Sequence, residues 1–327
     1  MKVAVIGFGS VGKRHVHNLL SLSDAQIVIY TKQRIVSPSP DRIKIVRTFQ
    51  ECLRERPDAC IIANVSSQHI SAATKFARAG VDLFIEKPLS NSTKGTKELA
   101  MLVRRKKLIT QMGCQFRFHK CIKEIKGLIA SNKLGRIISA RAECGSFLPD
   151  WHPYEDYTKS YAARDDLGGG VVLTNIHEID YLYWFFGDAA ETFSMTGRRS
   201  HLKMSADDLS VATIRFKNNV IAELHLDYFQ KPDFRSCKVI GTKGMAYWDS
   251  DANTVMLYDN KKNKWVKVAG WPNYDRNFMF KEELIHFLDC VKKRKTTINP
   301  AETDGINTLK IGLAIMKSSK ARKVIRP

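Results

Sequence analysis

The sequence predicts an α/β protein with two parts: a doubly wound parallel sheet, followed by an α+β domain with a large, mostly antiparallel sheet. In the first third, apolar runs of strand length alternate with segments of helical periodicity, which is typical of a parallel sheet with helices on both faces. After about residue 120 the runs lengthen and alternate apolar with polar residues, as antiparallel strands do. A chain of 327 residues also exceeds what one core normally serves.

The expected elements follow in chain order. In the first domain we expect strands at Val3–Gly7, Ile27–Tyr30, Ile43–Val46, Ala59–Ala63, Val81–Ile85 and Ile109–Gly113, with a helix over Val11–Leu22. In the second domain we expect a helix over Cys121–Asn132, strand-type stretches at residues 137–144, 209–216, 220–228 and 237–248, and turns at 218–219 and 242–244. Two further helices are expected at Phe278–Arg294 and Thr303–Ser319.

Composition and charge limit the function classes. The net charge of +20 favours an anionic partner, but the basic residues are spread along the chain without a nucleic-acid module, so we expect no nucleic acid. The longest apolar stretch, around residues 181–187, is too short to span a bilayer, and the chain opens directly on a strand without a leader, so we expect no membrane partner. The seven cysteines include no C-x-x-C pair and the histidines form no ligand cluster, which favours a reduced cytoplasmic setting without a metal.

The first strand runs into a glycine motif, IGFGSVGKRH. Gly7, Gly9 and Gly12 have G-x-G-x-x-G spacing at a strand-to-helix junction, which permits a tight turn, a close approach to a pyrophosphate and close packing of helix on strand. This context predicts dinucleotide binding by the loop, whose intervening residues are Phe8, Ser10 and Val11.

The end of the second strand bears on the choice of nicotinamide cofactor. An acid there would accept hydrogen bonds from the adenosine ribose, but Thr31, Lys32 and Arg34 occupy the place, and no acid follows until Asp41. This pattern favours NADP over NAD. The alternative is that Lys32 and Arg34 are simply solvated loop residues.

Four motifs occur in order along the chain: the glycine loop, Ala63-Asn64 followed by His69, Glu86-Lys87-Pro88, and GGGVVLTNIHEID at residues 168–180. With them the chain resembles the Gfo/Idh/MocA oxidoreductase family. The resemblance implies a Rossmann domain at 1–119, an open-faced α+β domain at 120–300, and a closing helix within 301–327 that packs back towards the Rossmann domain. It also implies hydride transfer between a nicotinamide and a carbon of a sugar, cyclitol or related compound.

Lys87 has two interpretations. Most lysines are solvated, but Lys87 follows a parallel strand at the sheet edge where such folds bind ligands. The resemblance implies that Lys87 contacts the reacting oxygen, that Glu86 orients the lysine or the cofactor amide, and that His177 takes part in proton transfer. Relatives commonly carry an aspartate before this histidine, where this chain has Thr174-Asn175.

The resemblance implies further site residues. For cofactor contact these are Asn64, Val65, Ser66, His69 and Gln115, and for substrate contact Arg117, Thr174 and Asn175. The composition of the segment at 150–170, which is rich in aromatic and charged residues, adds Trp151, Tyr161 and Arg164 as candidates that grip a sugar face and an anionic group. His69 could instead be a helix-start residue without contacts, and the aromatic segment at 150–170 could be a surface loop packed on itself.

We therefore expect a cytoplasmic NAD(P)-dependent dehydrogenase that acts on a hydroxyl or keto carbon of a sugar derivative, including nucleotide-linked or acidic forms. The segment at 151–170 resembles that of members associated with bacterial surface-sugar biosynthesis, whose substrates are anionic. The alternative is a non-catalytic nicotinamide-binding sensor or partner protein. An open sheet face would be buried against a second subunit, so we expect a homo-dimer or homo-tetramer.

Overall fold

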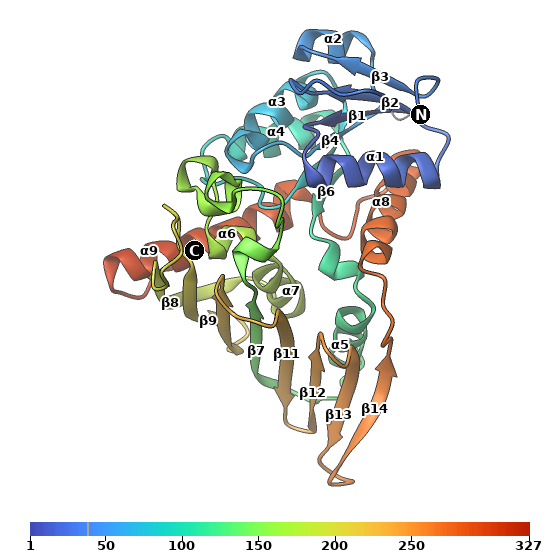
Figure 1. Ribbon diagram of the computed structural model, residues 1–327. Coiled ribbons are helices and arrows are strands. Elements are labelled where there is room, and N and C mark those ends of the chain that lie inside the picture. The colour runs from blue at the N-terminus through green and yellow to red at the C-terminus, as the bar shows by residue number, and fades with distance from the viewer. Residues whose placement is uncertain (38) are drawn as a thin grey trace. The chain divides into compact units, whose positions relative to one another are not determined.

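The computed structural model describes residues 1–37 and 39–327, and the chain divides into two compact units (Figure 1). The first unit combines residues 1–114 with residues 280–306. The second unit combines residues 115–279 with residues 307–327. Each unit has its own sheet, so each is described separately.

The first unit is built on a six-stranded parallel sheet with strand order β3-β2-β1-β4-β5-β6. Its strands are short buried runs rich in Val and Ile, as expected for a sheet that is covered on both faces. They are β1 (Lys2–Ile6), β2 (Gln26–Tyr30), β3 (Ile43–Val46), β4 (Ala59–Ile62), β5 (Asp82–Glu86) and β6 (Thr110–Gly113). The predicted doubly wound sheet is confirmed.

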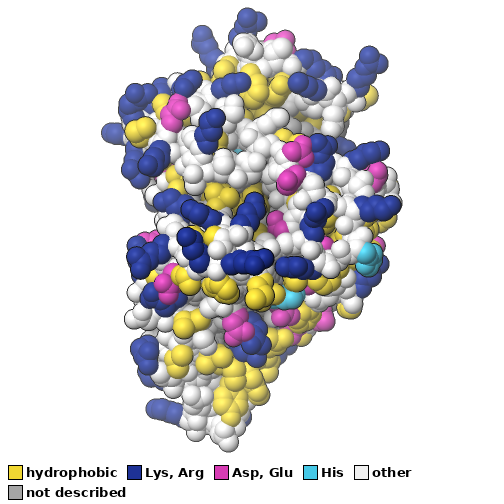
Figure 2. All heavy atoms as spheres, turned by 90° about the vertical axis from the view of Figure 1, so that its left-hand side faces the viewer, with side chains coloured by type: hydrophobic (Ala, Val, Ile, Leu, Met, Phe, Trp, Pro, Cys, Tyr) yellow, Lys and Arg dark blue, Asp and Glu magenta, His cyan; other side chains and the backbone are white. Residues whose placement is uncertain are grey.

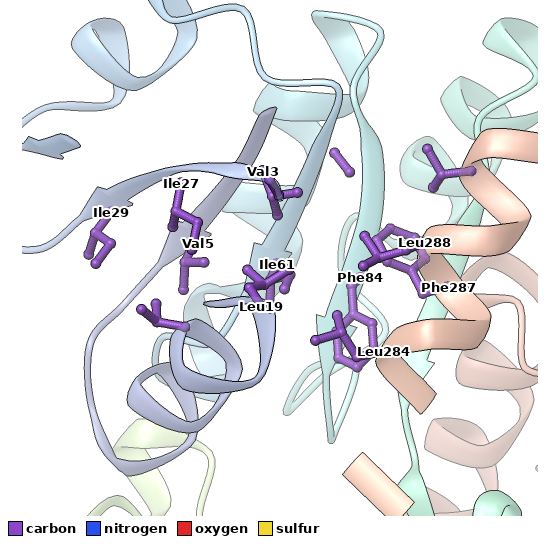
Figure 3. Close-up of a cluster of buried hydrophobic side chains, with 14 of the residues drawn as sticks. Val3, Val5, Leu19, Ile27, Ile29, Ile61, Phe84, Leu284, Phe287 and Leu288 are labelled. Carbon is purple, nitrogen blue, oxygen red and sulfur yellow. The ribbon is translucent and has the colours of Figure 1, made fainter. Parts of the chain in front are cut away.

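Helices pack on both faces of this sheet. On one face, α1 (Ser10–Leu22) and the later turns of α8 (Arg276–Lys293) share a buried cluster with β1, β2, β4 and β5. Figure 3 shows Phe287 and Leu288 of α8 close to Phe84 of β5. α3 (His69–Arg78) and α4 (Thr96–Lys106) contact each other outside this cluster, and α2 (Phe49–Arg54) contacts β2 and β3.

The second unit contains an eight-stranded sheet with order β14-β13-β12-β11-β7-β10-β9-β8. Neighbouring strands pair antiparallel except β7 and β10, which pair parallel from Ser139↔Ile221 to Gly145↔Asp227. The strands are β7 (Ile137–Gly145), β8 (Ala189–Gly197), β9 (Leu209–Phe216), β10 (Ile221–Asp227), β11 (Phe234–Gly241), β12 (Gly244–Asp249), β13 (Thr254–Asp259) and β14 (Lys264–Gly270). The predicted large, mostly antiparallel sheet is confirmed.

Helices cover one face of this second sheet. α5 (Lys120–Ala130), α6 (Val171–Thr174) and α7 (His177–Phe186) contact its strands, and α9 (Ile306–Ala321) is tied to β8, where the Ser194 hydroxyl donates to the carbonyl oxygen of Ile315 at 2.6 Å. Side chains alternate along the strands, so that Ala212 of β9 is buried while its neighbour Val211 is 47% exposed. The outward face therefore carries exposed apolar side chains.

The structure differs from expectation at several elements. β8, β13 and β14 were not predicted, because β8 begins with two alanines and ends in glycine, and β14 carries mostly exposed residues, so neither shows a clean apolar alternation. The later turns of α8, which we expected in the second domain, belong to the first unit because Leu284, Phe287 and Leu288 complete its core. The expected packing of the last helix towards the first domain stays a prediction.

None of the helices formed by residues 1–37 and 39–327 is both long and apolar enough to cross a membrane.

Candidate active site

The loop between β1 and α1 has the geometry that a bound dinucleotide requires. Gly7 adopts a φ of +95°, and a Cβ there would lie 2.7 Å from the carbonyl oxygen of Ala63. A Cβ on Gly12 would lie 2.3 Å from the carbonyl oxygen of Gly7, so only glycine permits this close packing. Gly9 borders open space, and the first turn of α1 carries no acidic residue. The N–H groups of the first helical turn therefore suit a phosphate ligand.

The residues after β2 form a basic strand end. Thr31 is buried, and its hydroxyl accepts a hydrogen bond from the Gln33 N–H at 3.1 Å. The side chains of Lys32 and Arg34 are exposed. Arg47 adds a third guanidinium or ammonium group here, because it donates to the carbonyl oxygen of Thr31 at 2.8 Å. An anionic group near this strand end would therefore meet positive charge.

The turn after β4 is held by His69. Asn64 and Val65 are half-buried, Ser66 is buried, and His69 begins α3. The ring of His69 is 1% exposed, with Nδ1 2.8 Å from the carbonyl oxygen of Pro88 and Nε2 2.9 Å from that of Asn64. Burial lowers the pKa of His69, against the effect of the two carbonyl oxygens. His69 thus joins the turns after β4 and β5, a contact that the sequence did not predict.

Lys87 lies between two buried residues, Glu86 and Pro88, and is itself half-buried. The Glu86 carboxylate accepts a hydrogen bond from the Lys87 N–H at 3.2 Å, and its other oxygen lies 2.7 Å from Nε2 of His15. Gly113 of β6 leaves room for this carboxylate, since a Cβ there would lie 2.9 Å from its carboxyl carbon. Of the two roles considered for Glu86, this geometry favours orientation of the lysine.

In the second unit, the turn after β6 meets the start of α7. Nε2 of Gln115 lies 3.3 Å from Nε2 of His177, and the Phe116 ring lies 5.1 Å from the His177 ring, centroid to centroid. Gln115 is 7% exposed and His177 is 4% exposed. The structure therefore brings together Gln115 and His177, which the sequence assigned to cofactor and substrate respectively.

Arg117, a substrate candidate from the sequence, is enclosed in the core. Its Nε and Nη2 donate to the two carboxylate oxygens of Asp180, both at 2.8 Å. Arg117 is 0% exposed and Asp180 is 1% exposed. A guanidinium in this bidentate pair fixes α7 to the turn after β6, so in this structure it serves as a structural link rather than facing open space.

Glu178, the residue after His177, forms a second ion pair. Glu178 is fully buried, and its Oε1 lies 2.8 Å from Nη1 of Arg235. The Arg235 guanidinium also lies 4.2 Å from the centre of the Phe116 ring. Burial, with the charges of Arg235 and Arg276, lowers the pKa of the neighbouring His119 to about 3, so His119 is neutral at physiological pH.

The triple-glycine loop is packed against backbone and against a half-buried acid, Asp207. A Cβ on Gly169 would lie 2.0 Å from the carbonyl oxygen of Tyr161, and one on Gly170 would lie 2.5 Å from Oδ1 of Asp207. Asp207 accepts the Val172 N–H at 3.1 Å, while burial raises its pKa. The Tyr228 hydroxyl donates to the carbonyl oxygen of Gly170 at 3.1 Å. These contacts fix the start of α6.

The candidates after this loop lie in a closely packed region. Thr174 is 1% exposed and Asn175 is 4% exposed. Where relatives were expected to carry an aspartate, this chain therefore has two buried neutral side chains. Asp207 and Tyr228 were not singled out in the sequence, because they lie more than 30 residues beyond the glycines and carry no motif of their own.

Of the three candidates in the aromatic segment, Trp151 and Arg164 have local side-chain partners. The Trp151 indole donates to the Ser146 hydroxyl at 3.0 Å and packs edge-on against Tyr228. Tyr161 is half-buried. Arg164 is exposed and forms an ion pair with Asp166 at 2.5 Å, so its charge is locally balanced. Among residues 1–37 and 39–327 no group of three or more His, Cys, Asp or Glu side chains could hold a metal ion.

A parallel sheet with a glycine-loop helix, joined to an open antiparallel domain, defines a Rossmann-type nucleotide-binding protein of two domains. Residues 1–114 match the family described as "Oxidoreductase family, NAD-binding Rossmann fold", and residues 122–247 match the "GFO/IDH/MocA C-terminal domain". The chain belongs to the GFO/IDH/MocA oxidoreductase family, as its motifs indicated.

Similar proteins include several polyol dehydrogenases. The myo-inositol 2-dehydrogenase of Thermotoga maritima is 23% identical over 100% of this chain and 98% of that protein. The scyllo-inositol 2-dehydrogenase (NAD(+)) of Bacillus subtilis is 24% identical over 97% of this chain and 94% of that protein. A solved structure of levoglucosan dehydrogenase with NADH superposes with a TM-score of 0.88 at 17% identity, covering 100% of this chain and 98% of that one. That similarity shows the fold.

Proposed function

We propose that this protein oxidises or reduces a CH–OH or keto carbon of a sugar or cyclitol with a nicotinamide cofactor, and that Lys87 and His177 handle the proton. The observation that carries the proposal is the place of Lys87. Lys87 follows β5 at the carboxyl end of the parallel sheet, which is the same end at which the glycine loop follows β1. The Glu86 carboxylate accepts the Lys87 N–H and so fixes the backbone of the lysine. Curated relatives named as inositol dehydrogenases support a polyol substrate.

The residues present fit a dinucleotide, because the glycine loop leaves space where its phosphates would lie. When bound, a nicotinamide supplies or accepts the hydride. Lys87 hydrogen-bonds the substrate oxygen, taking its proton as the carbonyl forms and returning it in the reverse direction. His177, oriented by Gln115 at 3.3 Å, is a second group for this proton. No acid is needed at Thr174 if these two groups suffice.

We favour NADP over NAD as the cofactor. The exposed Lys32 and Arg34, with Arg47 beside Thr31, support this preference because they would attract a 2′-phosphate. The NAD in the names of relatives concerns those proteins, whose strand ends need not be alike.

The substrate that we favour is anionic. The chain carries 53 Lys and Arg against 33 Asp and Glu, and Figure 2 shows basic side chains scattered over much of one face. A spread of this kind attracts anions without specifying a site. Sugar acids and nucleotide-linked sugars are therefore included among the candidate substrates.

We also favour a homo-dimer or homo-tetramer assembled through the outward face of the second sheet. Phe193 and Met195 of β8 and Val211 of β9 are 42%, 68% and 47% exposed, and Met195 pairs directly with Val211. Ile221 of β10 is 45% exposed on the same face, where it pairs with Arg215. Exposed apolar side chains that lie together, as Met195 and Val211 do, favour contact with another protein surface. Light scattering on the purified chain should give a mass of at least two subunits, and a monomer would contradict this assignment.

The function is tested by fluorescence titration with NADPH and NADH, followed by a panel of inositols, sugar acids and nucleotide sugars with and without Lys87→Met. We expect tighter binding of NADPH, and we expect Lys32→Asp to shift the preference about tenfold or more towards NADH, because an anion would then face the 2′-phosphate. Lys87→Met should lower turnover by roughly 10²- to 10⁴-fold with little change in cofactor affinity. Binding of neither nucleotide, or turnover unchanged by Lys87→Met, would refute the proposal.

A further inference from the structure

Two buried histidines hold the backbone on either side of Lys87. Before the lysine, Nε2 of His15 lies 2.7 Å from the Glu86 carboxylate, whose other oxygen accepts the Lys87 N–H. After the lysine, Nδ1 of His69 lies 2.8 Å from the carbonyl oxygen of Pro88. Both rings are almost completely enclosed, at 0% and 1% exposure. Lys87 is half-buried, whereas Glu86 before it and Pro88 after it are buried and are each in contact with one of the two histidines.

We propose that His15 and His69 are positioning residues that fix Lys87 where it exchanges a proton with the substrate. The inference rests on the proposed catalytic role of Lys87, but the anchoring itself can be measured without turnover. Neither histidine reaches a substrate in this arrangement, because both rings are enclosed. His69 also uses both ring nitrogens for backbone carbonyl oxygens, and His15 uses Nε2 for Glu86.

The chemistry of Glu86 explains why the first anchor is a histidine. A carboxylate enclosed among apolar neighbours is stable only when its oxygens are hydrogen-bonded. Here one partner is the Lys87 N–H and the other is the His15 ring, which stands edge-on to Phe84 at 5.0 Å. Without the His15 ring, one oxygen of the Glu86 carboxylate loses its partner, and the side chain turns towards water. This change alters the hydrogen bond to the Lys87 backbone.

The second anchor joins two strand ends. Nε2 of His69 lies 2.9 Å from the carbonyl oxygen of Asn64, so one ring connects the turn after β4 with the turn after β5. His15, for its part, stands on the helix that begins at the glycine loop. The two histidines therefore connect Lys87 with both loops that we assign to the cofactor. A displacement of about 1 Å at such a group can cost on the order of 100-fold in rate.

The first test measures the acetylation rate of Lys87 in the full chain by competitive labelling with acetic anhydride and mass spectrometry. Trypsin does not cleave before Pro88, so the peptide of residues 79–94 contains Lys87 internally. We expect His15→Leu and His69→Phe each to raise the labelling rate of Lys87 about threefold or more, because the turn opens locally. Lys75 of α3 should keep its rate. His15→Gln, which retains an N–H donor, should stay close to the unmodified protein.

The matched control is His17→Leu, since His17 is an exposed histidine on the same helix. An unchanged Lys87 rate in folded His15→Leu and His69→Phe would overturn the inference. If every lysine reacts faster, the variant has unfolded. The labelling rate of Lys87 is then measured in Glu86→Gln instead. That change removes the carboxylate but keeps its shape. A faster Lys87 with an unchanged Lys75 then supports the anchoring, and an unchanged Lys87 refutes it.

The second test uses turnover of the inositol or sugar that reacts best in the panel. His15→Leu should lower kcat by roughly 10- to 100-fold with the NADPH Kd changed less than about threefold. His15→Gln should restore most of the loss. In a Lys87→Met background His15→Leu should cost nothing further, because there is no lysine left to position. A full additional loss there would assign His15 to general stability. If Lys87→Met itself has no effect, the proposed function fails, while the labelling test still judges the anchoring.

Discussion

Removing Arg117 should destabilise the second unit far more than removing an arginine from a surface pair. Arg117→Met leaves the Asp180 carboxylate, which is 1% exposed, without its two bonds of 2.8 Å. A hydroxyl at Thr308, 3.4 Å from the same carboxylate, is a weak substitute for a cation. Breaking one side of a buried ion pair costs about 3–5 kcal/mol, since a buried charge is left uncompensated. We therefore expect a fall in melting temperature of roughly 10 °C.

The five tryptophans provide the assay. They stand at positions 151, 184, 248, 265 and 271, so all of them lie in the second unit together with Arg117. Trp184 also lies next to the pair, with the Arg117 guanidinium 5.7 Å from its ring. Unfolding in urea followed by tryptophan fluorescence reports this unit, even if the first unit unfolds separately.

Arg141→Met is the matched control. Arg141 and Glu223 form a pair of similar length, 2.6 Å, but their side chains are 56% and 57% exposed, so water screens the interaction and we expect no resolvable loss. The double change Arg117→Met with Asp180→Leu should recover most of the stability, because it removes both buried charges. Equal effects of Arg117→Met and Arg141→Met would show that burial of the pair does not determine its energy, and would refute the reasoning.

Three further predictions follow from the described contacts. The pKa of His119 is lowered to about 3 in the folded chain, whereas the unfolded chain binds a proton at this residue below about pH 6.5. The free energy of unfolding should therefore fall as the pH drops, by roughly 2 kcal/mol between pH 7 and pH 5. Urea unfolding at each pH measures this loss, which should be absent in His119→Phe. Gly12→Ala should weaken nucleotide binding by at least an order of magnitude, because the new Cβ would displace the Gly7 carbonyl that lies 2.3 Å away, whereas Gly127→Ala, which has open space, should bind normally in the same titration. Tyr228→Phe should cost about 1–2 kcal/mol of stability, because the buried carbonyl of Gly170 loses its donor, and an unchanged urea midpoint would contradict the role given to this hydroxyl.

Much of the first unit could be predicted because each signal was local. Its strands are short buried runs such as Ile27–Ile29 that need no partner to be recognised, and the glycine spacing fixes the turn that follows β1. The position of Lys87 after β5 followed from the same alternation. Long alternating strands such as β9 and β10 were equally clear, and Asn219 adopts the left-handed conformation expected of their turn.

The rest depends on contacts between residues that are far apart in the chain. His15 and Glu86 are 71 residues apart, and nothing local distinguishes His15 from His17 beside it, although only the former is buried. Arg117 was a substrate candidate through the family resemblance of its position after β6, and its pairing with Asp180, 63 positions away, could not be seen in the sequence. Edge strands such as β14 adopt their conformation through pairing with β13 rather than through their own side chains. The apolar periodicity of the sequence therefore does not predict them.

The composition of the first unit from two chain segments affects how the protein is made. The ribosome completes β1 to β6 early, but Leu284, Phe287 and Leu288, which cover Phe84 and Ile109, are translated only after the whole second sheet. At a synthesis rate of about 5–20 residues per second, this apolar surface stays exposed for roughly 10 to 40 s before α8 can cover it. The nascent Rossmann sheet is therefore a natural client for a chaperone, and a fragment that stops at residue 114 should be aggregation-prone even though it contains all six strands and the complete glycine loop.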